Sequence, residues 1–353
     1  MRFIHIADLH LGSSPEAEFA WGKDRAEELW DSLAAVLDAC NEKKIDLLLI
    51  AGDLFDRPPV WADLDRVSNM FSMLETTQVV IIAGAADYIG NDSPWLTYPW
   101  KPWVHVLADR HCTSVHLDEI NTSVSGCSYH ASSEPRPYLE DALVDNENEY
   151  QILLGYSNGE EYMPADFAQL AEKGFDYIAL GSEHKPRLLA DKRIAYAGSL
   201  EPLSESESGK HGLILGEISE DGTAVKFIPF ACREYINIKV RMSSDTKQDT
   251  LEEKLAKAME QYGSENIFSL SLEGRYKPGM PYDRERLMAL GNVCGIKDDT
   301  MPDYNIVALL EEHKDDMIGM YLEEFLKETS GTREQKAMYY GLEALLNAAH
   351  KTK

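Results

Sequence analysis

The sequence predicts an α/β fold, and three features of its first half support that prediction. Short apolar runs recur at residues 2–7, 45–51, 79–83 and 177–180, and a turn with polar side chains follows each run. Segments with the spacing of amphipathic helices separate the first three runs. Strands that alternate with helices are typical of a parallel sheet, and α/β enzymes place their ligands at the carboxyl ends of such strands. We therefore expect the four strand ends to converge on one site.

Composition indicates an ordinary soluble protein. The chain has 353 residues, of which 44% are apolar and 27% charged, and this length allows two or three domains. No stretch approaches the roughly 20 apolar residues of a membrane span, and residues 1–7 lack the apolar core of a signal peptide. The five cysteines include no CxxC pair. These observations favour a reduced, cytoplasmic protein without membrane association.

The net charge of −27 bears on the partners of the chain. Proteins that bind nucleic acid gain affinity when clustered Lys and Arg side chains release counterions from the phosphates. A chain with this excess of acidic residues is poorly suited to bind DNA unaided, although a local basic groove is compatible with it. The acidity is equally compatible with a role in solubility alone.

The other helices and strands expected in the first 232 residues are predicted from local sequence patterns. A helix is expected within residues 19–44, because Leu29, Leu33 and Leu37 recur at helical spacing, and a second over residues 61–75. Short strands are expected between residues 105 and 130, with turns at Asp118-Glu119 and Ser125-Gly126. Further strands are expected at residues 151–154, 193–198 and 212–217. Together these elements form one predicted core domain.

The rest of the chain is predicted to form two smaller parts. Residues 233–280 contain strand, helix and strand patterns and form a small α+β unit. Residues 281–353 are expected to be helical, in three segments at 283–290, 306–327 and 333–350. The last helices carry an apolar face that includes Met317 and Met320, and this face either packs back on the protein or binds a partner.

Four potential metal ligands follow predicted strands: Asp8, His10, Asp53 and His184. Two carboxylates and two imidazoles suit a divalent transition metal, because the carboxylates offset its charge and imidazole favours Mn, Fe or Zn over Ca or Mg. Any one of these residues alone would be an ordinary surface or structural residue. Their shared position at strand ends makes a metal site the stronger interpretation.

The motifs around these ligands resemble a known family. Asp8-x-His10, Gly52-Asp53-x-x-Asp56 and Gly181-x-x-His184 resemble the calcineurin-like metallophosphoesterases. The segments at 175–181 and 196–203 resemble more closely the SbcD family, the nuclease subunits of bacterial SbcCD complexes that process double-strand breaks.

The resemblance covers residues 1–232 and implies both a fold and an activity. The implied fold is a metallophosphoesterase-type β-sandwich core flanked by helices, with a small α+β capping domain at 233–280 and C-terminal helices at 281–353. The implied activity is that of a DNA repair exonuclease, a phosphodiesterase that uses two metal ions such as manganese. The implied partner is an SbcC-like coiled-coil ATPase of the ABC type, bound through the C-terminal helices; a homodimer is a second expected assembly.

This chain departs from the family pattern at one of the two metals. The residues that match the first metal are Asp8, His10, Asp53 and His184, and all four are present. In the family the second metal shares the residue that matches Asp53. The positions that match its other ligands hold Ala85, Tyr156 (or Gly155) and Ser182 in place of Asn, His and His. Ala86 stands where the family has a histidine that assists the reaction, so the catalytic position is lost. Asp56 and Asp87 are expected beside the ligands, and Asp87 equally suits a turn.

The pattern predicts at most one divalent metal, Mn or alternatively Fe or Zn, and no second metal. Two ions clamp the attacking and leaving oxygens of a phosphodiester, so the loss of one should slow hydrolysis by several orders of magnitude. The four first-site residues hold either a metal or only hydrogen bonds to one another.

Three functions remain open. The leading hypothesis is an SbcD-like metallophosphoesterase with weak or no nuclease activity that acts as a subunit or scaffold for the ATPase. The alternative is an active single-metal phosphodiesterase or nuclease that acts on DNA or on small phosphodiesters. The third is a structural protein without metal. Whether the chain is an enzyme is thus left open.

Other candidates are weaker. Ser199 has no neighbouring base in the sequence and suits a turn better than a nucleophile. Four further histidines lack the spacing of metal ligands and are expected to be ordinary surface or core residues: His105, His111, His116 and His130.

Overall fold

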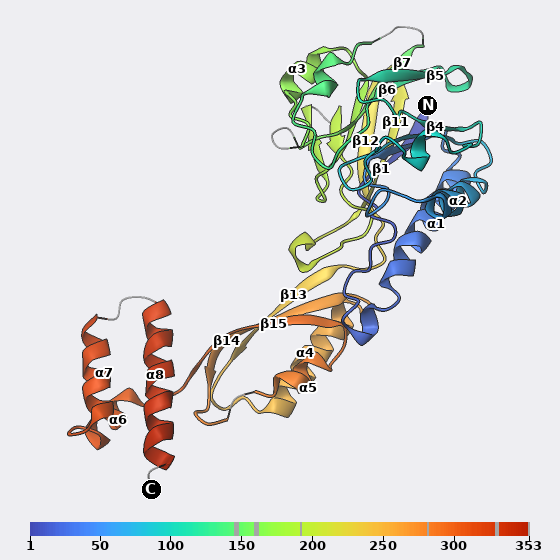
Figure 1. The fold of residues 1–353 in the computed structure, drawn as a ribbon. Helices are drawn as coiled ribbons and strands as arrows, with labels where there is room; N and C mark the ends of the chain where they lie inside the picture. Colours follow the sequence, from blue (N-terminus) through green and yellow to red (C-terminus); the bar gives the residue numbers. More distant parts are fainter. Residues whose placement is uncertain (145–147, 159–161, 191–192, 281, 329–331, 352–353) are drawn as a thin grey trace. The chain divides into compact units, whose positions relative to one another are not determined.

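The computed structural model describes residues 1–144, 148–158, 162–190, 193–280, 282–328 and 332–351. Its contacts divide the chain into two compact units, Met1–Tyr235 and Ile236–Lys353, which are described separately (Figure 1).

The first unit contains two six-stranded sheets, and the first has the order β12-β11-β1-β2-β3-β4. Strands β1 to β4 run parallel, and β11 and β12 add an antiparallel edge. The strands are β1 (Arg2–Ile6), β2 (Leu47–Ala51), β3 (Gln78–Ile82), β4 (Val104–Val106), β11 (Gly212–Ser219) and β12 (Gly222–Pro229). The three expected parallel strands at the start of the chain are confirmed.

The second sheet has the order β5-β6-β7-β8-β10-β9. Its four inner strands are parallel, and β5 and β9 pair antiparallel at the two edges. The strands are β5 (Thr113–Leu117), β6 (Thr122–Gly126), β7 (Tyr150–Tyr156), β8 (Tyr177–Gly181), β9 (Arg187–Leu189) and β10 (Ile194–Tyr196). The turn predicted at Ser125-Gly126 is wrong, because these residues continue β6 in its pairing with β5 and β7.

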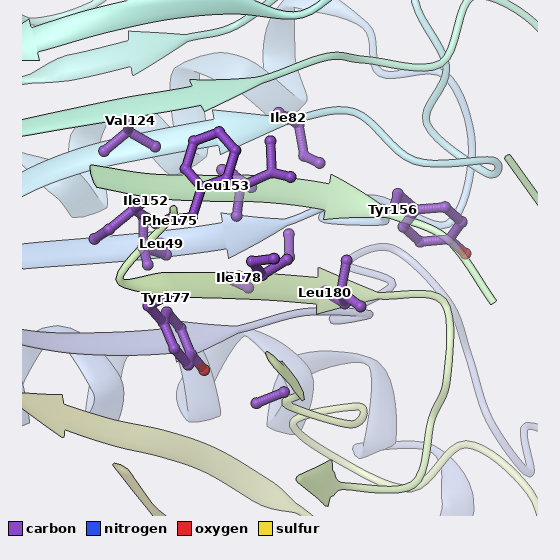
Figure 2. Close-up of a cluster of buried hydrophobic side chains, with 14 of the residues drawn as sticks. Leu49, Ile82, Val124, Ile152, Leu153, Tyr156, Phe175, Tyr177, Ile178 and Leu180 are labelled. Atoms are coloured by element: carbon purple, nitrogen blue, oxygen red, sulfur yellow. The ribbon is translucent and has the colours of Figure 1, made fainter. Parts of the chain in front are cut away.

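The two sheets pack face to face around one apolar core. Leu49 and Ile82 from the first sheet belong to the same buried cluster as Ile152 and Ile178 from the second (Figure 2). Each side chain of this kind stabilises the fold by about 1.5–3 kcal/mol when fully buried. Short α3 (Phe167–Glu172) contributes to the same cluster. This is the predicted β-sandwich.

Two helices cover the other face of the first sheet. Helix α1 (Arg25–Lys43) and helix α2 (Trp61–Phe71) bury their apolar faces in a second cluster with Leu48 and Ile50 of β2. Helix α1 ends where Lys44 takes a left-handed conformation, with φ of 52°. The predicted α/β class, with a sandwich flanked by helices, is therefore confirmed.

The second unit begins with a three-stranded sheet in the order β13-β14-β15. Strands β13 (Tyr235–Met242) and β14 (Ile267–Tyr276) and helices α4 (Gln248–Tyr262) and α5 (Arg284–Met288) match the expected elements. Strand β15 (Val293–Pro302) was expected to be helical or a connection, and this expectation is wrong. Its central residues are polar and partly exposed, so its strand conformation comes from parallel pairing with β14 and not from an apolar pattern.

Three helices complete the second unit. Helices α6 (Ile306–Glu312) and α7 (Met317–Glu328) replace the single helix expected over 306–327, because α6 ends at Glu312 and Asp316 caps the start of α7. The Asp316 carboxylate accepts from Ile318 N at 2.8 Å and lies 2.6 Å from His313 Nδ1. Helix α8 (Thr332–Lys351) packs beside α7 (Figure 1).

Among the helices that the structure describes, none is both long and apolar enough to cross a membrane. The domain limits at residues 232 and 280 stay predictions.

Candidate metal centre

The strand ends of the two sheets meet because Gly181 has no side chain. A Cβ on Gly181, the last residue of β8, would lie 2.0 Å from the carbonyl oxygen of Ala51, the last residue of β2. Glycine therefore allows the two strand ends to approach, and this explains its place before His184. Asp8, Asp53 and His184 leave the ends of β1, β2 and β8 at this junction.

The backbone of the ligand loops is constrained. Asp8 N donates to Gly52 O at 3.1 Å, and His10 N donates to Asp53 O at 3.0 Å. Asp8, His10 and Asp53 have φ values of 50°, 46° and 46°, which lie in the left-handed region that is uncommon for residues other than glycine. Strain of about 1–3 kcal/mol per residue is tolerated at functional sites, where it directs side chains.

Three of the predicted ligands form one cluster. Asp8, His10 and His184 each offer a ligand atom, and these atoms all lie within 4.8 Å of one another. Asp8 is fully buried, and the Nε2 atom of His10 is buried without a hydrogen-bond partner in the described residues. An unpartnered buried nitrogen is costly, and a cation bound between these groups would remove that cost. The residues present therefore fit one divalent metal.

The protonation of Asp8 and His10 depends on this crowding. Burial raises the pKa of Asp8 to about 7, although His184 and the amide of Ser182 partly offset it. Burial also lowers the pKa of His10, but the hydrogen bond to Asp56 and the nearby carboxylates outweigh burial and raise that pKa to about 9. A metal ion would bind in competition with these protons.

Asp53 lies beside the cluster and not within the group of three. Its Oδ2 atom is 3.7 Å from His10 Nε2. Both carboxylate oxygens accept hydrogen bonds, Oδ1 from Ala86 N at 2.8 Å and Oδ2 from the Tyr156 hydroxyl at 2.6 Å. The role of Asp53 as a metal ligand thus stays a prediction.

Tyr156 has a role that the sequence did not indicate. Its ring packs against the turn after β3, where a Cβ on Gly84 would lie 2.7 Å from Tyr156 Cε2 and 2.3 Å from Asp53 Oδ1. Tyr129 packs edge-on against it, with ring centroids 5.2 Å apart. Burial and the neighbouring carboxylates raise the pKa of Tyr156 well above its usual range, so the hydroxyl stays protonated and donates to Asp53.

Ser182, at another position assigned to the second metal, supplies its backbone amide, and Asp87 supports the turn that carries Ala85 and Ala86. Ser182 N donates to the two oxygens of Asp8 at 3.2 and 3.1 Å. Asp87 accepts from Gly84 N at 2.7 Å and from Phe55 N at 3.3 Å, and so holds the turn that carries Ala85 and Ala86. Burial and then Asp53 raise the pKa of Asp87 to about 8.

Each histidine of the cluster contacts a carboxylate through its Nδ1 atom. His10 Nδ1 is 3.2 Å from Asp56 Oδ1, and the supporting role of Asp56 stays a prediction. His184 Nδ1 is 3.0 Å from Glu207 Oε1, a residue that the sequence analysis missed. Glu207 is itself held by Leu203 N, which donates to Oε2 at 2.9 Å. Such carboxylates fix the ring orientation and leave Nε2 free for a metal.

The weaker candidates are structural. Ser199 Oγ lies 2.8 Å from His211 Nδ1, a base that sequence spacing did not reveal, but both residues are buried and out of reach of a substrate. His105, His116 and His130 contact Gln78, Ser123 and Ala108 O, respectively. His111 packs edge-on against Tyr138.

Comparison with known proteins places the chain in a family. Residues 1–186 match the model of the calcineurin-like phosphoesterases. The chain is 31% identical over 267 residues to the DNA double-strand break repair protein Mre11 of Methanocaldococcus jannaschii, which covers 68% of this chain and 70% of that protein. It is 27% identical over 308 residues to Mre11 of Sulfurisphaera tokodaii, with coverage of 78% and 74%.

A third relative is the uncharacterized metallophosphoesterase YhaO of Bacillus subtilis, 28% identical over 249 residues. That match covers 64% of this chain and 60% of YhaO, which is less than two thirds of the relative's length. The family match spans more than half of the chain and includes the strand ends that carry Asp8, Asp53 and His184. This chain belongs to the calcineurin-like phosphoesterase family.

Proposed function

We propose that this chain is an SbcD- or Mre11-like metallophosphoesterase that holds one divalent metal ion and has weak or no nuclease activity. The observation that carries the proposal is the 2.6 Å hydrogen bond from Tyr156 to Asp53 Oδ2. Tyr156 stands where the resemblance implies a histidine ligand of the second ion, and instead of an imidazole it presents a hydroxyl that donates to the carboxylate that both ions would share. Ala85, at another position of the second metal, has no side-chain atom that could bind a metal.

The remaining residues suit a single cation, Mn or alternatively Fe or Zn. Asp8, His10 and His184 would hold it, with Asp53 as a fourth ligand if its carboxylate turns toward the cluster. Such a cation, when bound, lowers the pKa of a coordinated water and polarises a phosphoryl oxygen. Ala86 offers no imidazole to the leaving group or to the developing charge, so hydrolysis of a phosphodiester is expected to be slow.

The second unit supports a role as a subunit or scaffold for a coiled-coil ABC-type ATPase. Helix α7 buries Ile318 and Leu322 with residues of α8, while Met317 and Met320 are 71% and 66% exposed. An apolar strip that remains exposed on a helix hairpin suits a partner helix. The net charge of −27 favours DNA contact through that partner, and a homodimer stays the second expected assembly.

Restoration of the lost groups tests this proposal. We would measure Mn-dependent cleavage of linear DNA by the wild type and by the variant Ala85→Asn/Ala86→His/Tyr156→His/Ser182→His. We expect little cleavage by the wild type and a clear gain in the variant. A control variant, Asp53→Ala in the restored chain, should lose the gain. Robust cleavage by the wild type that Asp53→Ala abolishes would contradict the proposal.

The intact cluster around the unpartnered His10 Nε2 favours a second candidate, a single-metal phosphodiesterase for small esters. Hydrolysis of bis(p-nitrophenyl) phosphate with Mn²⁺ tests it. Activity that His184→Ala removes would support this function. Activity that His184→Ala leaves unchanged would rule it out.

A further inference from the structure

The hairpin of β5 and β6 brings two cysteines together. In this antiparallel pair Thr113 lies opposite Gly126, Ser114 opposite Ser125 and His116 opposite Ser123. Cys112 directly precedes β5, and Cys127 directly follows β6. The same register therefore places Cys112 opposite Cys127 at the open end of the hairpin.

Side chains on this face of the hairpin already touch in pairs. Ser114 Oγ lies 2.8 Å from Ser125 Oγ, and His116 Nδ1 lies 3.1 Å from Ser123 Oγ. Because side chains alternate between faces with a period of two, the cysteines are the next pair on this face. Residues directly opposite in an antiparallel pair have Cα atoms about 4.5–5.5 Å apart, which lies within the roughly 4.4–6.8 Å that a disulfide needs.

The surroundings of the two thiols agree with this register. Cys127 is fully buried, and its Sγ lies 3.7 Å from Met163 Sδ. Cys112 is partly exposed and donates to Tyr138 O at 3.4 Å. The neighbouring Cys112 thiol, followed by burial, raises the pKa of Cys127 well above its usual range. Cys112 is thus the thiol that an oxidant reaches first.

The other three cysteines lie on separate elements of the described chain. Cys40 is buried in α1, where burial raises its pKa to about 12. Cys232 follows β12 and is exposed, and Cys294 lies in β15. They serve as internal controls for nonspecific oxidation.

We infer that Cys112 and Cys127 form a site of reversible disulfide formation, which a low-molecular-weight disulfide such as oxidised glutathione can oxidise. The Cys112 thiolate attacks the oxidant, forms a mixed disulfide and releases one glutathione thiolate. The Cys127 thiolate then attacks the Cys112 sulfur and releases the second. Two protein thiols are oxidised, one glutathione disulfide is reduced to two thiols, and the protons of the two cysteines pass to the two glutathione thiolates.

The bond would cross-link the hairpin close to one wall of the metal centre. Cys127 is two residues before Tyr129, whose ring packs against Tyr156. Tyr129 N also donates to Ala83 O at the end of β3. This inference does not depend on the proposed function, because it concerns thiol chemistry and not metal binding.

Mass spectrometry of the full chain tests the inference. Reduced protein is incubated with excess oxidised glutathione at about pH 8, where thiolates are more abundant, and free thiols are then alkylated. Glutamyl endopeptidase cleaves after Glu119, which lies between the two cysteines. We expect an intact mass lower by about 2 Da before alkylation, a linked pair of peptides that contain Cys112 and Cys127 after digestion, and reversal by dithiothreitol.

Variants sharpen the test. Cys112→Ser and Cys127→Ala should each abolish the linked pair, and Cys294→Ser should retain it. The peptide map of the wild type decides the question even if a variant folds poorly. The inference is overturned if both thiols of the wild type remain alkylatable, if Cys112 stops at the glutathione adduct, or if either cysteine links to Cys40, Cys232 or Cys294.

Discussion

The hydroxyl of Tyr156 donates to Oδ2 of Asp53 at 2.6 Å, and the same oxygen lies 3.7 Å from Nε2 of His10. Asp53 is the residue that the family resemblance assigns to both metals. This one oxygen therefore accepts from a buried, protonated tyrosine at a second-metal position and also lies near a first-site imidazole nitrogen that has no hydrogen-bond partner in the described residues. This arrangement is the physical basis for proposing one metal and not two.

Removal of the Tyr156 hydroxyl should therefore strengthen metal binding. In Tyr156→Phe, Asp53 Oδ2 loses its donor and can turn toward the first site, so we expect Mn²⁺ to bind several-fold more tightly in calorimetry. Without metal, Asp53 Oδ2 is left without its hydrogen-bond donor, which should lower the free energy of unfolding by about 1–3 kcal/mol. The control is Tyr177→Phe, which removes another buried hydroxyl, 2.9 Å from His5 Nδ1. Equal Mn²⁺ affinities in both variants would contradict this role of Tyr156.

Glu207 should act as a positioning residue for His184. Glu207→Gln keeps the size of the side chain but weakens the 3.0 Å contact with His184 Nδ1, and loss of such a partner typically costs about 10- to 100-fold in metal affinity. Calorimetric titration with Mn²⁺ measures this loss. Glu205→Gln, an exposed residue of the same loop, is the matched control. An affinity that Glu207→Gln leaves unchanged would mean that the loop does not orient His184.

Stability should fall in acid because of His5. Burial lowers the pKa of this residue to about 3, although a backbone hydrogen bond to Leu180 opposes the shift. In the unfolded chain the pKa is about 6.5, so below that pH the unfolded state binds a proton that the folded state does not. The stabilising contribution is complete above about pH 6.5 and is lost as pH falls toward 3, at up to about 1.4 kcal/mol per pH unit.

Denaturant unfolding between about pH 6.5 and 5 checks this prediction. The free energy of unfolding should decline more steeply with acidity in the wild type than in His5→Gln, which cannot titrate. The comparison concerns the two slopes, so an overall loss of stability in the variant does not affect it. Parallel slopes would show that His5 does not remain neutral in the fold.

The exposed face of α7 should carry partner binding. We expect Met320→Glu to weaken binding to the ABC-type ATPase from the same genome at least tenfold, because a charge would be buried against an apolar partner surface. Analytical ultracentrifugation of the two purified proteins measures this. The control is Met73→Glu, which alters an exposed methionine of the other unit. Equal loss in both variants, or none in either, would contradict a docking role for α7.

The strand ends of the site could be predicted from sequence because each is encoded locally. Asp8, Asp53 and His184 each follow an apolar run, and parallel strands bring their carboxyl ends to one edge. Glu207 could not be found in this way. It lies 23 residues after His184, and only the path of the loop brings the two together.

Tyr156 illustrates a second limit. The sequence left Gly155 and Tyr156 as alternatives for one family position, because pairing with β8 determines the orientation of β7. A Cβ on Gly155 would lie 2.7 Å from Leu139 Cδ1, so this residue faces the core, while Tyr156 faces Asp53. Strand β15 was missed for a related reason, since its polar residues take strand conformation through pairing with β14.

Manganese stoichiometry tests the central claim most directly. Protein stripped with a chelator is titrated with Mn²⁺ in a calorimeter, and its melting temperature is recorded with and without the ion. We predict one ion per chain and a higher melting temperature when it is bound, with both effects lost in His184→Ala. Two ions per chain would show that other residues rebuild the second site. No binding, with an unchanged melting temperature, would contradict the metal centre itself and favour a purely structural protein.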